Sequence, residues 1–370
     1  MTTLQLNELC TTFKSDILVN KIEKDTGDYP LFGAKGAMTG LNTYQQSKPY
    51  ISIIKWGAGV GRAELRPPYS SIVATMLGVL PNDNVDLHWL FYLLQSMHLE
   101  QYATNAVVPN LYFKDYCNTS IPVPGLDEQI RISDLLDRVQ RIIDTRKQQL
   151  SILDDLIKAR FVEMFGDPVS NPKGWPMPPI EDVVAGDRNA LKAGPFGSAL
   201  KKEYYVDAGY KIYGQEQVIS GDPNYGDYYI DEERYKQLEN CAVQAGDVLI
   251  SLVGTYGKLL IMPNKFEPGI INPRLMKITF DKGKVNPYYF QHFFQSDSLK
   301  KALADNTHGG TMDILNLGIV RKIKMPLPPI ELQNDFVAFV AQIDKSKAAV
   351  QKALDEAQVL FDSLMQQYFG

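Results

Sequence analysis

A duplicated helix-forming segment constrains the fold of this chain more than any other feature. The C-terminal segment has residues spaced alternately four and three apart, the heptad spacing of a long helix that packs on a partner helix. Lys347 is the polar member of this seam. The seam positions are Phe336, Val340, Ile343, Lys347, Val350, Leu354, Ala357, Phe361, Leu364 and Tyr368. A helix this long cannot bury its own apolar stripe, so it needs a second helix.

The second helix is predicted in the same chain, 204 residues earlier. Its seam keeps the same register, with Arg146 and Arg160 as polar members. The positions are Ile132, Leu136, Val139, Ile143, Arg146, Leu150, Leu153, Ile157, Arg160 and Met164. The flanking residues repeat too, since Ile121-Pro122-Val123-Pro124 matches Met325-Pro326-Leu327-Pro328, Gln129 matches Gln333, and Phe165-Gly166 matches Phe369-Gly370. Two such copies, each preceded by a long segment, indicate a tandem duplication.

Length and composition indicate two globular domains besides the helices, because 370 residues exceed what one core usually organises. Cys10, Cys117 and Cys241 are far apart and form no CxxC pair, which is typical of free thiols in a reducing compartment. No apolar run approaches the ~20 residues of a membrane span, and the N-terminus lacks a signal-peptide pattern. We therefore expect a cytoplasmic protein without membrane contact. A net charge of -5 argues against indiscriminate binding to polyanions but allows local basic loops.

The two globular segments follow one order: strands, a glycine loop, more strands, a helix, a polar loop, a last strand and the proline-led long helix. In the first we predict strands at 49–56 and 71–80 and a helix at 86–103. In the second we predict strands at 210–213, 247–253, 259–262 and 275–280 and a helix at 287–304. Gln95-Ser96 corresponds to Gln295-Ser296 at an offset of 200. The predicted fold class is α/β (α+β), with two diverged domains and two long helices.

No catalytic motif is found in the sequence. The phosphate-loop, HExxH and GxSxG patterns are missing, and no Cys/His cluster has ligand spacing. The segment 57–61 (GAGVG) would need a following helix to bind a nucleotide, but Pro67 and Pro68 leave room for barely one turn. The sequence 66–69 (RPPY) differs from the methyltransferase motif Asn/Asp-Pro-Pro-Tyr because Arg66 offers no acceptor, and 286–289 (NPYY) lacks the second proline. We interpret these segments as structural.

What remains is a binding surface of loops rich in cations, amides and hydroxyls. Lysine and arginine can neutralise phosphates, while Asn, Thr and Arg can read base edges. The candidates in the second half are Lys192, Phe196, Ser198, Lys201, Lys202, Thr255, Tyr256, Lys258, Asn272, Arg274, His308 and Thr311. Those in the first half are Lys35, Asn42, Lys55 and Arg62. For any single residue, an ordinary solvated turn is the alternative interpretation.

Several of these segments together resemble the specificity (S) subunits of Type I DNA restriction–modification enzymes. The resemblance spans essentially the whole chain, and the duplicated proline-led start of the long helix is its most specific part. The matching segments are 121–129 (IPVPGLDEQ), 325–333 (MPLPPIELQ), 194–201 (GPFGSALK), 246–251 (GDVLIS), 271–275 (INPRL) and 29–36 (YPLFGAKG). The first half has no loop like 194–198, so no functional position of the family transfers there.

The resemblance implies two target-recognition domains, residues 1–120 and 167–324, and two conserved helices, residues 121–166 and 325–370. The helices would pair as an intramolecular antiparallel coiled coil with pseudo-twofold symmetry. Each domain would read one half of a bipartite sequence in double-stranded DNA. The chain would recruit two modification (M) subunits, which bind S-adenosylmethionine and methylate adenine at N6, and restriction (R) subunits could join. The chain itself would be non-catalytic, with no cofactor and no metal.

Two other readings of the sequence stay open at this point. The first is a methyltransferase or nuclease with degenerate motifs in this chain, which predicts binding of S-adenosylmethionine or cleavage of DNA by the isolated protein. The second is a coiled-coil scaffold that holds protein partners without contacting DNA. That reading predicts no sequence preference in a selection from random DNA.

Overall fold

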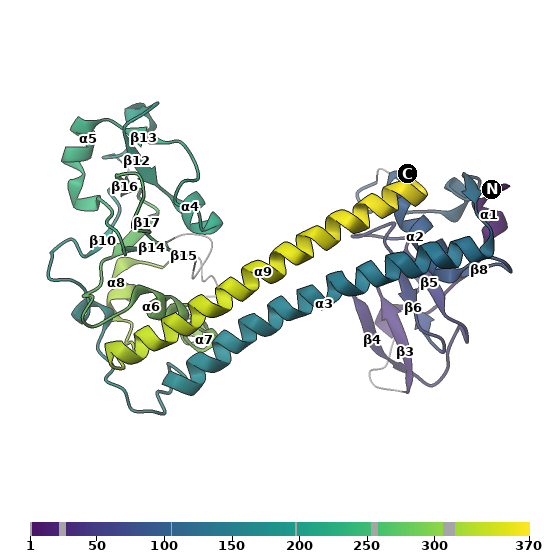
Figure 1. Cartoon of the computed structure of the whole chain (residues 1–370), viewed down its shortest axis with the longest axis horizontal. Helices are drawn as coiled ribbons and strands as arrows, with labels where there is room; N and C mark the ends of the chain where they lie inside the picture. Colours follow the sequence, from purple (N-terminus) through teal and green to yellow (C-terminus); the bar gives the residue numbers. More distant parts are fainter. Residues whose placement is uncertain (1, 22–26, 105, 197, 253–257, 306–314) are drawn as a thin grey trace. The chain divides into compact units, whose positions relative to one another are not determined.

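The computed structural model describes residues 2–21, 27–104, 106–196, 198–252, 258–305 and 315–370. The chain forms two compact units, one made of Met1–Gln149 with Val350–Gly370 and the other of Leu150–Ala349. Two 40-residue helices, α3 (Leu126–Phe165) and α9 (Ile330–Phe369), each contribute one part to each unit (Figure 1). The predicted domain boundaries stay predictions, because these units share both helices. No helix among the described residues is long and apolar enough to cross a membrane.

In the first unit, the described strands form a sheet of order β2-β8-β5-β6, a sheet of order β4-β3-β7, and the pair β1-β9. The strands are β1 (Thr2–Gln5), β2 (Cys10–Lys14), β3 (Tyr29–Gly33), β4 (Gly36–Leu41), β5 (Tyr50–Ile54), β6 (Ala63–Arg66), β7 (Ser71–Ile72), β8 (Met76–Pro81) and β9 (Ser120–Val123). The short helices are α1 (Leu6–Leu9), η1 (Val19–Lys21), α2 (Leu87–Ser96), η2 (Leu99–Tyr102) and η3 (Phe113–Asp115).

In the second unit, the described strands form sheets of order β10-β17-β14-β15 and β11-β13-β12-β16. The strands are β10 (Leu191–Ala193), β11 (Tyr205–Val206), β12 (Tyr210–Tyr213), β13 (Tyr229–Ile230), β14 (Val248–Ser251), β15 (Leu259–Ile261), β16 (Gly269–Ile271) and β17 (Leu275–Ile278). The shorter helices are η4 (Ile180–Asp182), η5 (Lys202–Tyr204), α4 (Gln215–Ser220), α5 (Glu232–Gln237), η6 (Glu239–Cys241), α6 (Pro287–Phe294), α7 (Asp297–Asp305) and α8 (Leu317–Lys322).

The two units share one strand topology. In each, a central strand (β8 or β17) pairs antiparallel with two strands, and the short strand before it (β7 or β16) pairs parallel with a strand of the other sheet. The strands β2, β3, β4, β5, β6, β7 and β8 therefore correspond to β10, β12, β13, β14, β15, β16 and β17. This correspondence confirms two tandem α/β (α+β) domains.

Burial explains why these segments become strands. All five residues of β5 and all four of β14 are buried. Strands covered on both faces consist of continuous apolar runs instead of alternating ones. The helices that pack beside them begin at polar caps, because the side chains of Asp86 and Asn286 accept hydrogen bonds from the backbone N–H groups of Trp89 and Tyr288. These caps fix the residue at which each helix begins.

The two long helices pack against each other within each unit. In the first unit, Val139 and Ile143 of α3 form a cluster with Ala357 of α9, and further α9 residues pack beside them. In the second unit, Phe161 of α3 packs edge-on against Phe336 of α9, with ring centroids 5.4 Å apart. The early part of α3 thus meets the late part of α9, and the reverse. The pairing is antiparallel, as predicted.

Near the end of α3, the polar seam position Arg160 was predicted. It is half-buried, its guanidinium pairs with Glu163 at 2.8 Å and lies 5.7 Å from the centroid of the Phe339 ring of α9, and the neighbouring Phe161 and Phe165 are buried. An α-helix has 3.6 residues per turn and therefore drifts relative to a strict heptad. Phe161 and Phe165 consequently face the core, where both rings contact Tyr289. The polar seam position Lys347 was predicted, and its amino group pairs with Asp154 at 2.6 Å.

Several predicted elements are interrupted where the backbone must turn. The predicted helix at 86–103 ends as α2 at Ser96, because His98 adopts a left-handed conformation with φ of 46° before η2 begins. The predicted strand at 71–80 breaks at 73–75 into β7 and β8, and the predicted helix at 287–304 breaks after Phe294. The strand at 210–213 is confirmed as β12. Val253, at the end of another predicted strand, lies outside the described residues.

Candidate nucleic-acid interface

The loops singled out in the second half meet at one edge of the sheet. β10 and β14 both run antiparallel to β17, so the chain leaves both strands where β17 begins. The short link 272–274, which joins β16 to β17, lies at the same place. We call this region the β17 edge, defined as residues 193–196, 198–202, 251–252, 258 and 272–274. Three segments that are distant in sequence therefore form one surface.

Backbone hydrogen bonds fix the turn at the centre of the β17 edge. The N–H of Asn272 donates to the carbonyl of Tyr213 at 2.8 Å, and the N–H of Leu252 donates to the carbonyl of Arg274 at 2.9 Å. The side-chain oxygen Oδ1 of Asn272 accepts from the N–H of Arg274 at 2.9 Å. The turn is tied to both sheets. It therefore presents the exposed Arg274 side chain from a rigid support.

Gly194 and Gly214 allow the backbone to approach this turn closely. A Cβ atom on Gly194 would lie 1.9 Å from the carbonyl oxygen of Asn272, and one on Gly214 would lie 2.7 Å from the Asn272 amide nitrogen. A Cβ at Gly194 would force the backbone of the turn to move, whereas one at Gly214 would displace the Asn272 side chain. Gly194 is therefore needed for the close packing of the 194–198 loop against Asn272.

The side chains at the β17 edge are suited to a polyanion with aromatic bases. Phe196 is 90% exposed, and Ser198, Lys201 and Lys202 are exposed beside it. Lys192 is half-buried on β10. Cations near an exposed aromatic ring can contact phosphates and bases together. The structure thus places Phe196, Ser198, Lys201 and Lys202 at the β17 edge with Asn272 and Arg274, and Lys192 directly before it on β10.

Lys258 has a second environment. Its carbonyl accepts a hydrogen bond from the N–H of Ser251 at 3.4 Å, which places its backbone at the β17 edge. The residue also lines a hollow of about 780 Å³ together with Tyr288, Lys300 and Lys347. Helices α3, α6, α7 and α9 contribute to this hollow. The predicted residues Thr255, Tyr256, His308 and Thr311 lie outside the described residues.

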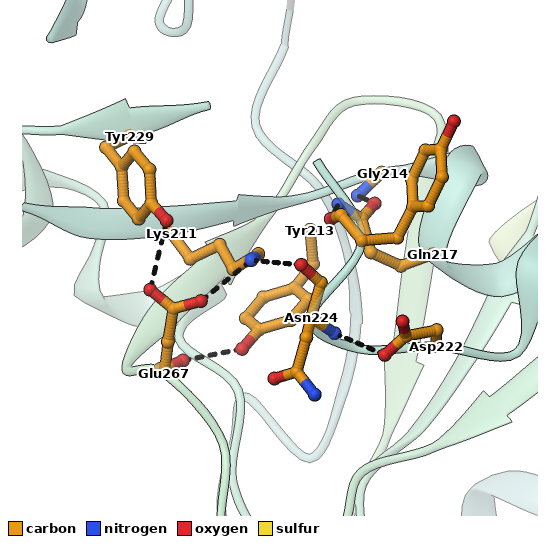
Figure 2. A network of polar contacts seen from close by, with 9 residues as sticks. Lys211, Tyr213, Gly214, Gln217, Asp222, Asn224, Tyr229 and Glu267 are labelled. Atoms are coloured by element: carbon orange, nitrogen blue, oxygen red, sulfur yellow. Dashed lines mark hydrogen bonds and ion pairs between the residues drawn. The ribbon is translucent and has the colours of Figure 1, made fainter. Parts of the chain in front are cut away.

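A polar network supports the loop that follows α4 (Figure 2). The amino group of Lys211, which is buried, donates to Glu267 Oε1 at 2.8 Å and to the carbonyl of Asn224 at 3.0 Å. Tyr229 donates to Glu267 Oε2 at 3.1 Å, and Tyr213 donates to the Glu267 carbonyl at 2.6 Å. The hydrogen bond from Lys211 lowers the pKa of Glu267. Sequence reasoning did not single out Lys211, because a lysine is ordinarily a surface residue.

Gln217 extends this support to the turn at the β17 edge. Its Oε1 accepts from the backbone N–H of Gly214 at 2.8 Å, and its Nε2 donates to the carbonyl of Tyr225 at 2.6 Å. Gly214 also lies against Asn272, because a Cβ atom there would lie 2.7 Å from the Asn272 amide nitrogen. The network thus fixes both the loop 221–226 and the support of the candidate site.

The motif 246–251 has a structural role. Asp247 is fully buried, and its carboxylate accepts hydrogen bonds from the backbone N–H of Gln244 at 2.8 Å and from the hydroxyl of Thr279. The amino group of the buried Lys277 lies 3.6 Å away. Burial raises the pKa of Asp247, and the charge of Lys277 opposes that rise. The group is held inside the domain, away from any ligand.

In the first unit, three of the four predicted residues lie at one edge. Lys35 is exposed at the turn between β3 and β4, and the Arg62 guanidinium donates to the adjacent carbonyl of Ala34. Lys55 directly follows β5, and the pKa of its amino group is lowered by burial and by the nearby charge of Lys14. Asn42 follows β4 at the opposite end of that hairpin. The structure therefore does not bring Asn42 together with the others.

The glycine loop and the RPPY sequence are structural, as predicted. The segment 57–61 leads into β6 rather than a helix, so it presents no helix N-terminus to a phosphate. Arg66 is buried, its Nε donates to the hydroxyl of Ser52 at 2.8 Å, and its guanidinium lies 4.4 Å from the centroid of the Phe32 ring. Within the part of the chain that the structure describes, no group of three or more His, Cys, Asp or Glu residues could hold a metal ion.

Sequence reasoning missed Trp56 on the first unit. Its side chain is 54% exposed although it follows the apolar strand β5. The available signal was an aromatic residue placed between a buried strand and a glycine loop. An exposed aromatic ring offers a face on which a nucleic-acid base can stack.

Solved structures share this arrangement of domains and helices. The S subunit of a Type I restriction–modification system from M. genitalium aligns over 100% of this chain and 96% of its own, with a TM-score of 0.61 and 16% identity. A second structure, described as concerning complex assembly and conformational transition of the type I R-M system, gives a TM-score of 0.57 at 16% identity, covering 100% of this chain and 97% of that chain. At these identities, the likeness establishes the fold.

Sequence comparison identifies the family. Residues 1–153 and 189–357 match the Type I restriction modification DNA specificity domain, so this chain belongs to that family. The MjaVIII specificity subunit of Methanocaldococcus jannaschii is 22% identical over 298 residues, covering 74% of this chain and 68% of the relative. The EcoKI specificity subunit of Escherichia coli is 23% identical over 407 aligned residues, covering 96% and 83%. As a family member, the chain is a specificity subunit and not a catalytic one.

Proposed function

We propose that this chain reads a bipartite sequence in double-stranded DNA, one half with each unit, for a Type I restriction–modification complex. The observation that carries the proposal is the shared strand topology of two units that present different side chains at the same sheet edge. A duplicated support with diverged loops is what two different half-sites require. A protein that held two equal partners would have no need of different side chains in these loops.

The β17 edge supports DNA reading by the second unit. Lys201 and Lys202 are exposed next to Phe196, so their charges are available to phosphates. Arg274 projects from a turn fixed by hydrogen bonds, and a guanidinium can donate two hydrogen bonds to the O6 and N7 atoms of guanine. Rigid support lowers the entropic cost of binding.

The chemistry of the complex is assigned to partner subunits. We propose that the chain recruits two M subunits, which bind S-adenosylmethionine and methylate adenine at N6, and that R subunits join for cleavage. The cofactor would be held by the M subunits, because the sequence of this chain offers no motif for it. Extrusion of the target base costs unstacking energy, so affinity would depend on phosphate contacts and fall with salt.

The test is a selection from random DNA with the complex of this chain and its M subunits. We expect an enriched sequence with two defined parts separated by an undefined spacer. Arg274→Ala should lower the binding free energy by about 1–3 kcal/mol and relax the base preference at one position of the site. Lys201→Ala should weaken binding to all DNA sequences alike and reduce the slope of log affinity against log salt concentration by about one. Lys284→Ala, beyond the opposite end of β17, is the matched control and should leave binding unchanged.

Two results would contradict the proposal. Recovery of no preferred sequence by a complex that still assembles would favour a scaffold without DNA contact. Binding of S-adenosylmethionine by the isolated chain would place catalytic chemistry in this subunit instead. For the variants Arg274→Ala, Lys201→Ala and Lys284→Ala, co-purification with the M subunits shows that the protein is folded.

A further inference from the structure

The turn at 272–274 has a hydrogen-bonding pattern that can be recognised elsewhere in the chain. The N–H of Asn272 donates to the carbonyl of Tyr213 at 2.8 Å, at the end of the parallel strand β12. The N–H of Leu252 donates to the carbonyl of Arg274 at 2.9 Å, and that of Leu275 donates to the carbonyl of Asn272 at 3.1 Å. The three bonds define the position of each residue in the turn.

The first unit repeats all three bonds. The N–H of Val73 donates to the carbonyl of Phe32 at 3.0 Å, near the end of β3. The N–H of Lys55 donates to the carbonyl of Thr75 at 3.1 Å, and that of Met76 donates to the carbonyl of Val73 at 3.0 Å. The link between β7 and β8 is thus the counterpart of the link between β16 and β17. Thr75 occupies the position that Arg274 occupies in the second unit.

Two exposed apolar side chains, Trp56 and Val107, lie on segments near Thr75, beside the cation Lys55. Trp56 follows Lys55 directly, and its backbone forms an isolated antiparallel bridge with Asn110. The N–H of Gly57 donates to the carbonyl of Pro109 at 3.2 Å, which holds the nearby loop against this edge. In that loop Val107 is fully exposed. An exposed tryptophan and an exposed valine therefore lie on segments bound to the same edge.

The two equivalent positions differ in the bases they suit. A guanidinium pairs with the O6 and N7 acceptors of guanine, whereas a threonine methyl or an aromatic ring makes apolar contact with the C5-methyl group of thymine. We propose that Thr75 and Trp56 contact a thymine methyl group in one half-site, while Arg274 contacts a guanine in the other. This inference rests on the proposed reading of DNA by both units. It adds which side chains of the first unit read bases and what they read.

The probe is the DNA sequence selected by the wild-type complex, synthesised with uracil in place of each thymine in turn. Uracil lacks only the C5-methyl group. We expect one substitution, confined to one half-site, to weaken binding about fourfold, the equivalent of one buried methylene. Trp56→Ala and Thr75→Ser should weaken binding to thymine DNA and remove its advantage over uracil DNA. Thr75→Val, which keeps a methyl group, should retain the advantage.

A reciprocal exchange tests the equivalence itself. Thr75→Arg should shift the preference at one position of the first half-site toward guanine, and Arg274→Thr should remove a guanine preference from the other half-site only. Tyr69→Ala is the matched control, because Tyr69 is an exposed aromatic residue that precedes β7 at its other end. It should change neither preference.

The outcomes separate this inference from the proposed function. If the wild-type complex selects a bipartite sequence but no thymine-to-uracil substitution weakens binding, the inference is overturned while the proposed function stands. The same follows if Trp56→Ala and Thr75→Ser complexes, assembled with their M subunits, keep the wild-type thymine advantage. If the wild-type complex selects no sequence, the proposed function itself fails.

Discussion

Gln129 and Gln333 make the same three hydrogen bonds at the starts of the two long helices. Each side chain is fully buried. The Oε1 atom of Gln129 accepts from the backbone N–H of Asp86, which caps α2, and that of Gln333 accepts from the backbone N–H of Asn286, which caps α6, both at 2.9 Å. The Nε2 groups donate to backbone carbonyls of Asn84 and Pro124 in one copy and of Lys284 and Pro328 in the other. One glutamine thus joins each long helix to the adjacent domain.

Replacing either glutamine should destabilise its own unit. Gln129→Ala or Gln333→Ala leaves buried backbone groups unpaired, which costs about 1–3 kcal/mol for such a group. Urea unfolding of the full chain measures the change. Gln351→Ala is the control, since Gln351 is exposed on α9 and its amide donates to Asp355 at 2.8 Å. Equal stabilities for all three variants would show that the buried glutamines do not join helix to domain.

Phe336→Ala should be the most destabilising single change on the α9 seam. Its ring is fully buried between Phe161 and Phe165, at 5.4 Å and 5.5 Å between centroids. Loss of such a ring from a packed core costs about 3–5 kcal/mol. The half-buried neighbour Phe339 lies against Arg160, and Phe339→Ala should cost about 1 kcal/mol. Thermal unfolding of the two variants checks this prediction: Phe336→Ala should lower the unfolding temperature more than Phe339→Ala, and the reverse order would contradict it.

Gly194→Ala should disturb the β17 edge, whereas Gly186→Ala should not. A Cβ atom at Gly194 would meet the Asn272 carbonyl, while one at Gly186 meets no atom within 4 Å. Forcing the turn at 272–274 to move should cost about 1–3 kcal/mol in stability. It should also weaken DNA binding, because Arg274 shifts with the turn. An unchanged affinity in the Gly194→Ala complex would separate this turn from DNA reading.

Acidification should weaken the second unit through His292. Burial lowers the pKa of His292 below its ordinary value of 6.5, while Asp344 opposes and Lys347 adds to this shift. A histidine with a lowered pKa in the folded state contributes stability above the unfolded value, and this contribution is lost as pH falls. The unfolding free energy of the wild type should therefore decrease below about pH 6.5. In His292→Gln this decrease should be smaller, as measured by urea unfolding between pH 5 and pH 8 in ~0.5-unit steps.

Glu267 should stabilise the second unit at neutral pH but not in acid. The hydrogen bond from Lys211 lowers its pKa below 4.5, so its contribution is present above that value and lost as pH falls through the folded-state pKa. Because the Glu267 side chain is 44% exposed, water can partly replace it, and Glu267→Gln should cost about 1–2 kcal/mol at pH 7.

The control for this prediction is Glu232→Gln. Glu232 pairs with Lys236 on the surface of α5 at 2.7 Å, and exposed pairs of this kind contribute little. The difference between wild type and Glu267→Gln should narrow below pH 4.5. A difference that stays constant down to pH 3 would mean that the charge of Glu267 has no part in the stability of the unit.

The long helices could be predicted because their signal is local and repeated. Heptad spacing over forty residues predicts a long helix that needs a partner helix, and the duplication places that partner in the same chain. The antiparallel pairing was implied by the resemblance to specificity subunits. The burial of Phe161 beside the seam could not be predicted in the same way. It depends on Tyr289, which lies far away in the sequence and stacks against Phe161.

The candidate site was only partly predictable. The residues 194–202 and 272–274 were identified from their chemistry, but nothing in the sequence places them at one sheet edge, because the pairing of β10 and β14 with β17 is non-local. The equivalence of Thr75 and Arg274 was invisible for another reason. Backbone hydrogen bonds define it, and the side chains at the two positions share no chemistry. Lys211 and Arg66 are further cases, since their burial depends on partners supplied by other strands.

The division of the chain into units has a consequence for synthesis. The second unit is one continuous stretch, Leu150–Ala349, whereas the core of the first also contains Phe361 and Phe369, whose ring lies 6.0 Å from that of Trp89. A ribosome releases the second unit in full before those two phenylalanines emerge. The N-terminal half must therefore wait, with part of its apolar surface uncovered, while the half that is translated later can already be folded. For this chain, the order of translation and the order of maturation are reversed.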